Sequence, residues 1–291
     1  MHPPATALLT LLALIAFASN SILTRLALGT GAMDAASFTT VRLAAGAVVL
    51  LAIVRAQGRP APGAGGRGAG RKGEWIGPLA LFAYAAPFTF AYVRIGAATG
   101  ALLLFGSVQI TMIGWGIASG ERPRVRSWIG IAAAAAGLAW LVLPSLRRPD
   151  PVGSALMVVA GCAWGVYSLA GKKATNALAA NARSFAWAVP LAVLLNVAAA
   201  SSMSVTARGF VLAAVSGGVT SGVGYAIWYR ALRGLSATQA GIVQLSVPVI
   251  AAGGAVAFLG ESVSPRLAAS GAAVIGGLAL VLSDRARPRP S

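Results

Sequence analysis

Long apolar segments are the feature that most constrains the fold of this chain. A helix needs about 20 largely apolar residues to cross the hydrocarbon core of a bilayer. The 291 residues contain ten such segments: 6–28, 35–54, 75–93, 97–118, 127–144, 152–171, 182–200, 209–229, 237–259 and 267–282. Charged residues make up only 10% of the chain, against about 25% in ordinary soluble domains. The sequence therefore predicts an all-α membrane protein with ten transmembrane helices.

Basic residues gather in alternate connections between these segments. If the N-terminus lies in the cytoplasm, sixteen Lys and Arg residues fall on the cytoplasmic side and six on the opposite side. Cytoplasmic connections are typically enriched in Lys and Arg, so both termini are predicted to be cytoplasmic. We therefore interpret the net charge of +17 as a topology signal and predict no nucleic-acid partner, because no nucleic-acid motif accompanies the charge.

The two halves of the chain resemble each other. Gly120–Glu121 and Gly260–Glu261 lie 140 residues apart, and each pair stands between an apolar segment and a segment rich in small residues. Five segments per half is an odd number, so the second half must enter the membrane with the opposite orientation. The sequence predicts two inverted five-helix repeats, residues 1–146 and 147–291, an arrangement that many transporters use for alternating access.

Helix-weakening residues recur beside aromatic residues in the two halves. An offset of 137 residues pairs Pro87 with Gly224, Phe88 with Tyr225, and Tyr92 with Tyr229. Proline removes a backbone donor and clashes with the preceding turn. Pro87, Gly224 and Pro248 are therefore the predicted hinges, although a proline kink in a membrane helix is also compatible with simple packing.

Aromatic side chains at helical spacing are candidate cavity walls. Tyr84, Phe88 and Tyr92 are spaced by four residues and share one face of their segment. Such a stripe can contact lipid or another helix, but a phenol near the middle of a span needs a polar partner. Together with Tyr225 and Trp228 of the eighth segment, we interpret the stripe as one wall of a substrate-binding cavity.

Polar side chains inside apolar segments form a second group of candidates. They are Asn20, Gln109, Gln244 and Ser246. Burial in hydrocarbon without a partner costs several kcal/mol, so each must bond a neighbouring helix or contact a substrate. Trp164 and Tyr167, three residues apart, add a second aromatic patch that is compatible with core packing or with substrate binding.

Arg42 is the one basic residue well inside a predicted span, about 10–12 Å from the start of its segment. It could extend to the interface, pair with Asp34, or contact a substrate carboxylate. The first two roles are favoured on general grounds.

The sequence lacks the residues that several kinds of chemistry require. The six acidic residues fall in connections or at segment ends, and the only histidine is His2. We therefore predict no enzyme, metal site or cofactor, and no intramembrane proton relay. An intramembrane enzyme acting on lipid is disfavoured, and a purely structural membrane protein remains an alternative. Small-residue helix faces serve packing or dimerisation equally well, so both a monomer and a homodimer stay open.

Four stretches resemble a known family. They are FASNSILTRLAL (17–28), TTVRLAAGAVVLL (39–51), CAWGVYSLAGKK (162–173) and SVPVIAAGGAVAFLGESVS (246–264). Their order and spacing are similar to those of the EamA-type ten-helix transporters of the drug/metabolite transporter superfamily. The resemblance spans about residues 6–283, although Phe17–Ala18 replace the Trp–Gly of many members.

The resemblance implies two inverted halves around a central cavity in the bacterial cytoplasmic membrane. Within the superfamily, the chain is most similar to bacterial exporters of amino acids, including aromatic ones. It implies a small-molecule exporter that works by alternating access, with neutral amino acids as substrates. Export of hydrophobic drugs or of other metabolites on the same fold is the alternative.

Overall fold

The computed structural model describes residues 3–58, 75–95, 97–143, 150–259 and 264–283. The first half contains α1 (Pro3–Leu28), α2 (Ala35–Ala56), α3 (Ile76–Tyr92), α4 (Ala97–Ala118) and α5 (Val125–Val142). The second half contains α6 (Pro151–Lys172), α7 (Ala177–Ala198), η2 (Ala200–Ser202), α8 (Ala207–Val215), η3 (Ser216–Val223), α9 (Gly224–Ala231), η4 (Leu232–Gly234), α10 (Ala237–Val243), α11 (Ser246–Leu259) and α12 (Pro265–Leu282). Apart from one isolated bridge between Met33 and Val205, the regular structure of the described residues is helical.

The length and hydropathy of these helices fit a membrane protein, as the sequence predicts. Eight helices of the described residues are long and apolar enough to cross a bilayer, among them the continuous run Ala207–Gly234 formed by α8, η3, α9 and η4. α3 is a shorter apolar helix, and α10 and α11 together cover the ninth predicted segment.

The ninth segment differs from the prediction of one continuous helix over 237–259. It breaks into α10 and α11 at Gln244. Pro248 supplies the physical reason, because its ring would clash with the Gln244 carbonyl in a helix and its nitrogen cannot donate to that carbonyl. The Gln244 carbonyl instead accepts from the Val247 N–H at 3.1 Å. Pro248 thus lies in the first turn of a new helix.

The eighth segment contains a second irregularity, the π-helical stretch η3. π-Helices are rare and are often found at functional sites. η3 packs closely on α2, and a Cβ added to Gly217 would overlap the backbone of Arg42. The absence of a side chain at Gly217 therefore allows the approach that places the η3 hydroxyls beside Arg42.

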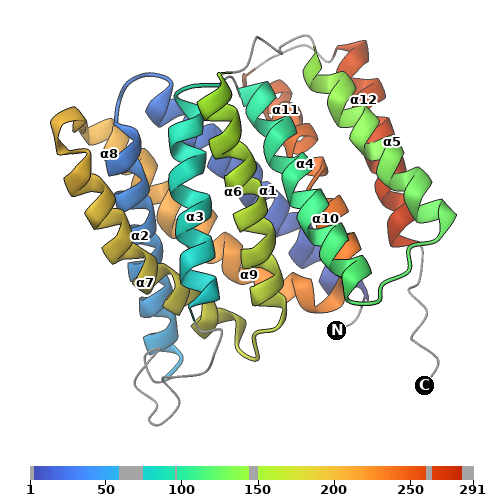
Figure 1. Cartoon of the computed structure of the whole chain (residues 1–291), viewed down its shortest axis with the longest axis horizontal. Helices are drawn as coiled ribbons and strands as arrows, with labels where there is room; N and C mark the ends of the chain where they lie inside the picture. Colours follow the sequence, from blue (N-terminus) through green and yellow to red (C-terminus); the bar gives the residue numbers. More distant parts are fainter. Residues whose placement is uncertain (1–2, 59–74, 96, 144–149, 260–263, 284–291) are drawn as a thin grey trace.

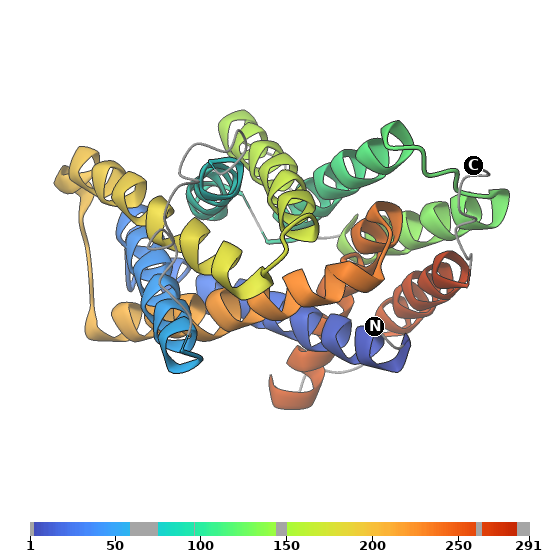
Figure 2. The ribbon, with the colours of Figure 1, turned by 90° about the horizontal axis from the view of Figure 1, so that it is seen from below.

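Helices of the first half pack mainly against helices of the second half. α5 packs against α12, α2 against α7, and α3 and α4 against α6, while α1 contacts α9 and α11. Figure 1 shows α5 and α12 together at one end of the molecule, with α2, α7 and α8 at the other. Figure 2 shows two layers, with α3, α4, α5 and α6 facing α1, α2, α9 and α12. The buried core lies between these layers.

Hydrogen bonds join the halves at the edge that carries the α1–α2 and α7–α8 connections. The Asp34 carboxylate accepts from the Ser204 N–H at 2.9 Å, and the Thr206 N–H donates to the Ala32 carbonyl at 3.0 Å. These bonds tie a connection of the first half to a connection of the second.

Glu121 joins the halves at the opposite edge, where the α4–α5 connection meets the start of α10 (Figure 1). Its carboxylate accepts from the N–H groups of Ala237 at 2.6 Å and Thr238 at 3.0 Å. Partial burial raises the pKa of the Glu121 carboxyl, but hydrogen bonds from Thr238, Ala237 and Ser236 outweigh this effect and lower the pKa below its usual value. Glu121 therefore stabilises the N-terminus of α10 in its ionised form.

This geometry predicts a pH-dependent contribution of Glu121 to stability. Because its pKa is lower in the folded protein, ionised Glu121 stabilises the fold above its unfolded-state pKa, and this contribution is lost as pH falls through the folded-state pKa. Glu121→Gln should reduce the free energy of unfolding by about 1–2 kcal/mol at pH 7. Unfolding in detergent at pH 7 and at pH 3 measures it, with the neighbouring exposed Arg122→Gln as control. An equal deficit of Glu121→Gln at both pH values would contradict the electrostatic explanation.

Candidate functional site

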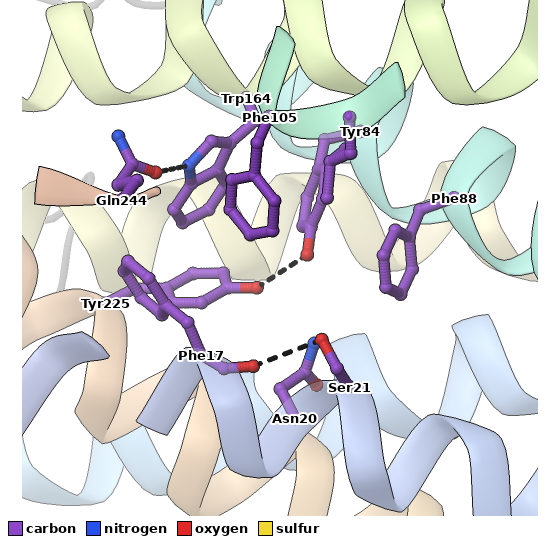
Figure 3. Close-up of a pocket in the computed structure, with 10 residues that line it drawn as sticks. Phe17, Asn20, Ser21, Tyr84, Phe88, Phe105, Trp164, Tyr225 and Gln244 are labelled. Carbon is purple, nitrogen blue, oxygen red and sulfur yellow. Dashed lines mark hydrogen bonds between the residues drawn. The ribbon is translucent and has the colours of Figure 1, made fainter. Parts of the chain in front are cut away.

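A small cavity lies between the two layers of helices. Its volume is about 30 Å³, which is room for one or two water molecules. It is lined by Phe17, Asn20 and Ser21 of α1, Tyr84 and Phe88 of α3, Leu104 and Phe105 of α4, Trp164 of α6, Tyr225 of α9, and Gln244 between α10 and α11. Figure 3 shows Tyr84 and Trp164 pointing in from one side and Phe17 and Asn20 from the other. Both halves of the chain therefore contribute to the cavity.

The cavity brings together six of the residues that the sequence singled out as substrate-binding candidates. They are Asn20, Tyr84, Phe88, Trp164, Tyr225 and Gln244. The lining also includes four residues that sequence reasoning missed, namely Phe17, Ser21, Leu104 and Phe105. Helical spacing from Asn20 could have identified Phe17, whereas nothing in the sequence distinguishes Leu104 and Phe105 from lipid-facing residues.

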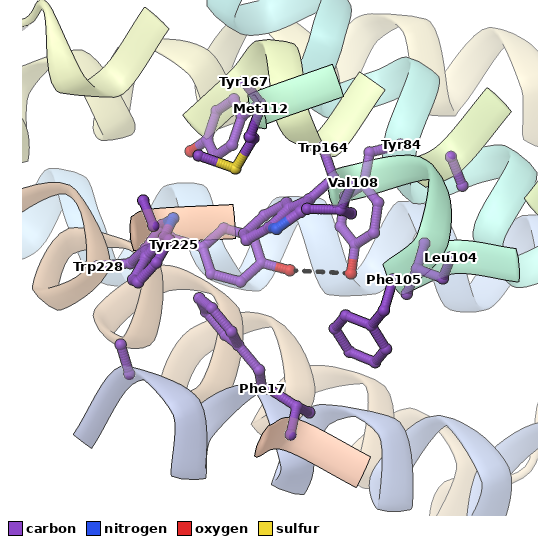
Figure 4. Packing of buried hydrophobic residues seen from close by; sticks show 14 of the residues in the cluster. Phe17, Tyr84, Leu104, Phe105, Val108, Met112, Trp164, Tyr167, Tyr225 and Trp228 are labelled. Carbon is purple, nitrogen blue, oxygen red and sulfur yellow. Dashed lines mark hydrogen bonds between the residues drawn. The ribbon is translucent and has the colours of Figure 1, made fainter. Parts of the chain in front are cut away.

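An aromatic cluster forms much of the cavity wall (Figure 4). The Trp164 ring centroid lies 4.6 Å from that of Tyr225, 4.8 Å from that of Tyr84 and 5.2 Å from that of Phe17. Tilted and edge-on contacts at these distances are favourable for aromatic rings. The cluster thus connects α1, α3, α6 and α9 around one indole.

Arg42 lies fully buried behind the two tyrosines, with 1% of its surface exposed. Its Nη2 donates to the Tyr225 hydroxyl at 2.6 Å and to the Tyr84 hydroxyl at 3.2 Å, and its Nε donates to the Ser221 hydroxyl at 2.9 Å. Its carbon Cζ lies 5.4 Å from the Tyr84 ring centroid and 5.7 Å from that of Phe88. The guanidinium therefore touches three residues of the cavity wall, and its Nη1 has no hydrogen-bond partner among the residues that the structure describes.

Two of the three expected roles of Arg42 are wrong. The side chain does not extend to the interface, since it is buried, and it does not pair with Asp34, whose carboxylate accepts from the N–H groups of Ser37 and Ser204. No carboxylate of the described residues forms a salt bridge with Arg42. A buried cation without an anionic partner is costly. The third role, contact with a substrate carboxylate, stays a prediction.

Asn20 and Gln244 both line the cavity and hold neighbouring elements. The Asn20 Oδ1 accepts from the Ser216 hydroxyl of η3 at 2.7 Å. The Gln244 Oε1 accepts from the Trp164 indole N–H at 2.6 Å, and its Nε2 donates to the Ala240 carbonyl at 2.8 Å. These bonds fix the orientation of both amides at the cavity surface.

The other five candidates lie outside the cavity lining. They are Tyr92, Gln109, Tyr167, Trp228 and Ser246. The Tyr92 ring packs on Phe88 at 4.6 Å, and the Tyr167 hydroxyl donates to Asn181. The Trp228 indole donates to Ser168 at 3.0 Å, and the Ser246 hydroxyl donates to the Val243 carbonyl at 2.6 Å. The Gln109 Nε2 is buried and has no hydrogen-bond partner within the described part of the chain.

The three hinge candidates lie in three different helices, and Pro248 is in the first turn of α11. Pro87 lies inside α3, which continues through it, and Gly224 is the first residue of α9, directly after η3.

No group of three or more metal-ligating side chains occurs among the residues that the structure describes.

Comparisons with known proteins found a matching family, a close relative in sequence and a similar solved structure. Residues 151–283 match the EamA-like transporter family. "Uncharacterized protein PA1977" of Pseudomonas aeruginosa is 45% identical over 280 residues, which cover 96% of this chain and 95% of that protein. A solved crystal structure of another protein is similar with a TM-score of 0.76 at 18% identity, over 96% of this chain and 97% of that chain, and so has the same fold.

The contacts of Arg42 predict that its tyrosine partners contribute to stability. Tyr225→Phe should destabilise the protein by about 1–3 kcal/mol, because it leaves a buried guanidinium N–H without its closest acceptor. Tyr84→Phe should cost less, since its bond to Arg42 is longer. Thermal unfolding in detergent measures the effect, with Tyr92→Phe as the matched tyrosine that lies outside the cavity lining. A Tyr225→Phe variant as stable as Tyr92→Phe would contradict this account.

Proposed function

We propose that this chain is a membrane transporter of small metabolites, as its match to the EamA-like transporter family supports, and that it exports neutral amino acids, including aromatic ones, across the bacterial cytoplasmic membrane. The observation that carries the proposal is the unpartnered Nη1 of Arg42 beside a cavity with aromatic walls.

The chemistry of the cavity suits a carboxylate attached to an apolar body. A guanidinium binds a carboxylate with directional hydrogen bonds that a point charge cannot provide. The rings of Phe17, Phe88 and Phe105 offer an apolar surface for a side chain. The Asn20 Oδ1 can accept a hydrogen bond from an α-amino group. One buried cation, an apolar surface and a hydrogen-bond acceptor match a zwitterion with an aromatic or aliphatic side chain.

The packing of the helices supports the proposal of two inverted repeats. α2 with α7 and α5 with α12 are pairs of equivalent helices. The contact of α3 with α6 has its counterpart in α1 with α9, and that of α4 with α6 has its counterpart in α1 with α11. A contact pattern that is preserved when the halves are exchanged is what a twofold-related repeat produces.

The size of the cavity and its surroundings support the proposal of alternating access. A volume of about 30 Å³ is too small for an amino acid, so substrate binding requires the surrounding helices to separate. Asp34 with Ser204 joins the halves at one edge, and Glu121 with α10 joins them at the other. Opening one edge at a time would expose the cavity to each side in turn.

Transport without a proton relay is part of the proposal. The three acidic residues that the structure describes are Asp34, Glu121 and Asp150. Each lies in a connection or at a helix end, away from the cavity lining. The solute would then move down its own gradient.

Transport in proteoliposomes tests the proposed function. Counterflow of labelled phenylalanine should occur with and without a pH gradient, and unlabelled phenylalanine should compete while phenethylamine, which lacks the carboxylate, should not. Arg42→Gln should reduce the flux by at least about tenfold, the effect of losing a charged hydrogen bond. Arg94→Gln removes only a solvent-accessible salt bridge to Asp150 at 3.6 Å, so this variant should retain the wild-type flux.

Two results would contradict the proposal. Equal competition by phenethylamine and phenylalanine would remove the carboxylate from recognition. Flux of a hydrophobic cationic dye alone would favour drug export on the same fold.

The proposed hinge at Pro87 predicts a kinetic effect. Pro87→Ala restores a backbone donor inside α3, so it should stiffen the helix and slow phenylalanine counterflow several-fold while leaving protein abundance unchanged. Pro151→Ala is the matched control, because an exposed proline in the first turn of α6 removes no ladder bond. Unchanged counterflow in Pro87→Ala would remove this residue from the mechanism.

A further inference from the structure

A second, much larger cleft lies apart from the cavity and shares no lining residue with it. Its volume is about 1220 Å³, and it opens where α1 and α7 begin and where α2 and α9 end. Its lining includes Leu8 and Leu9 of α1, Gln57 after α2, Thr175 before α7, Arg230 of α9 and Arg233 of η4.

The lining is apolar on its walls and basic at one end. Val223 at the end of η3 is followed at helical spacing by Ala226 and Ile227 of α9, and Arg230 follows one turn after Ala226. Leu8 and Leu9 of α1 also belong to the apolar part. The cleft therefore offers a long apolar surface that ends at a positive charge.

Arg233 adds a second positive charge, and its position is fixed. Its Nη2 donates to the Ala174 carbonyl at 3.1 Å and to the Thr175 carbonyl at 2.5 Å. Arg230 and Arg233 are both exposed, and none of the described lining residues is acidic. The cleft therefore has unopposed positive charge available to an anion.

The location of the cleft favours a lipid over a soluble anion. Leu8 and Leu12 on the same part of α1 are 59% and 43% exposed, as expected for side chains that face hydrocarbon. The arginines lie at the edge predicted to be cytoplasmic, where anionic lipids attract basic residues. Apolar walls next to hydrocarbon and arginines at the head-group level match the two parts of a phospholipid.

We propose that this cleft binds an anionic phospholipid, with the phosphate contacting Arg230 and Arg233 and an acyl chain lying along α1 and α9. The site is separate from the substrate cavity, so lipid binding does not depend on which solute is transported.

Native mass spectrometry of the full chain in detergent tests this site, with phosphatidylglycerol and phosphatidylcholine as probes. The wild type should bind phosphatidylglycerol more tightly than phosphatidylcholine. Arg230→Gln with Arg233→Gln should weaken phosphatidylglycerol binding about tenfold or more, since each arginine contributes a charge near the head group. Arg230→Gln alone provides a milder variant that keeps the Arg233 bonds to the α6–α7 connection.

A matched control removes the same charge elsewhere. Arg122→Gln with Arg126→Gln changes two exposed arginines, one in the α4–α5 connection and one in the first turn of α5, and should leave lipid binding unchanged. Ala226→Trp should fill the apolar wall and weaken binding without altering charge. Equal binding of both lipids by the wild type, or equal losses in the two double variants, would overturn the proposal. Unchanged phosphatidylglycerol binding in Ala226→Trp together with lost phenylalanine counterflow would also overturn it, and would assign the cleft to the transport path.

Discussion

The guanidinium of Arg42 lies where α2, α3, α9 and η3 meet, and the surrounding hydroxyl groups accept hydrogen bonds from its Nε and Nη2. Tyr84, Tyr225 and Ser221 accept its hydrogen bonds, and they come from three elements of both halves. A cation buried in a membrane protein is expensive, and removal of one partner leaves that cost uncompensated. The helices around the cavity are therefore held in register by one side chain.

Two features of the remaining structure enclose the region around the Arg42 guanidinium. The π-helical turn and Gly217 let η3 approach the backbone of α2, so that Ser221 reaches Arg42. Aromatic rings around Trp164 close the cavity on the other side. Hydrogen bonds at Asp34 and at Glu121 join the two halves at the two edges of the bundle. In the proposed alternating access, opening one edge at a time would expose the site to one side of the membrane.

Much of the fold follows from the sequence, because apolar length alone defines a span. The break at Gln244 follows from Pro248. The residues before and after the break are mostly apolar, so hydropathy alone predicted one continuous helix. Aromatic spacing identified Tyr84, Phe88 and Tyr225, which line the cavity, whereas Leu104 and Phe105 have the composition of lipid-facing residues. The environment of Arg42 could not be predicted from the sequence, because Ser221 and Tyr225 lie 179 and 183 positions away and contact Arg42 only through tertiary packing.

A structure determined with bound phenylalanine is the most direct test of the role of Arg42. The account predicts a widened cavity in which a carboxylate oxygen lies within hydrogen-bond distance of the Arg42 Nη1, with the phenyl ring among Phe17, Phe88 and Phe105. A substrate bound elsewhere, or one whose carboxylate points away from Arg42, would contradict it.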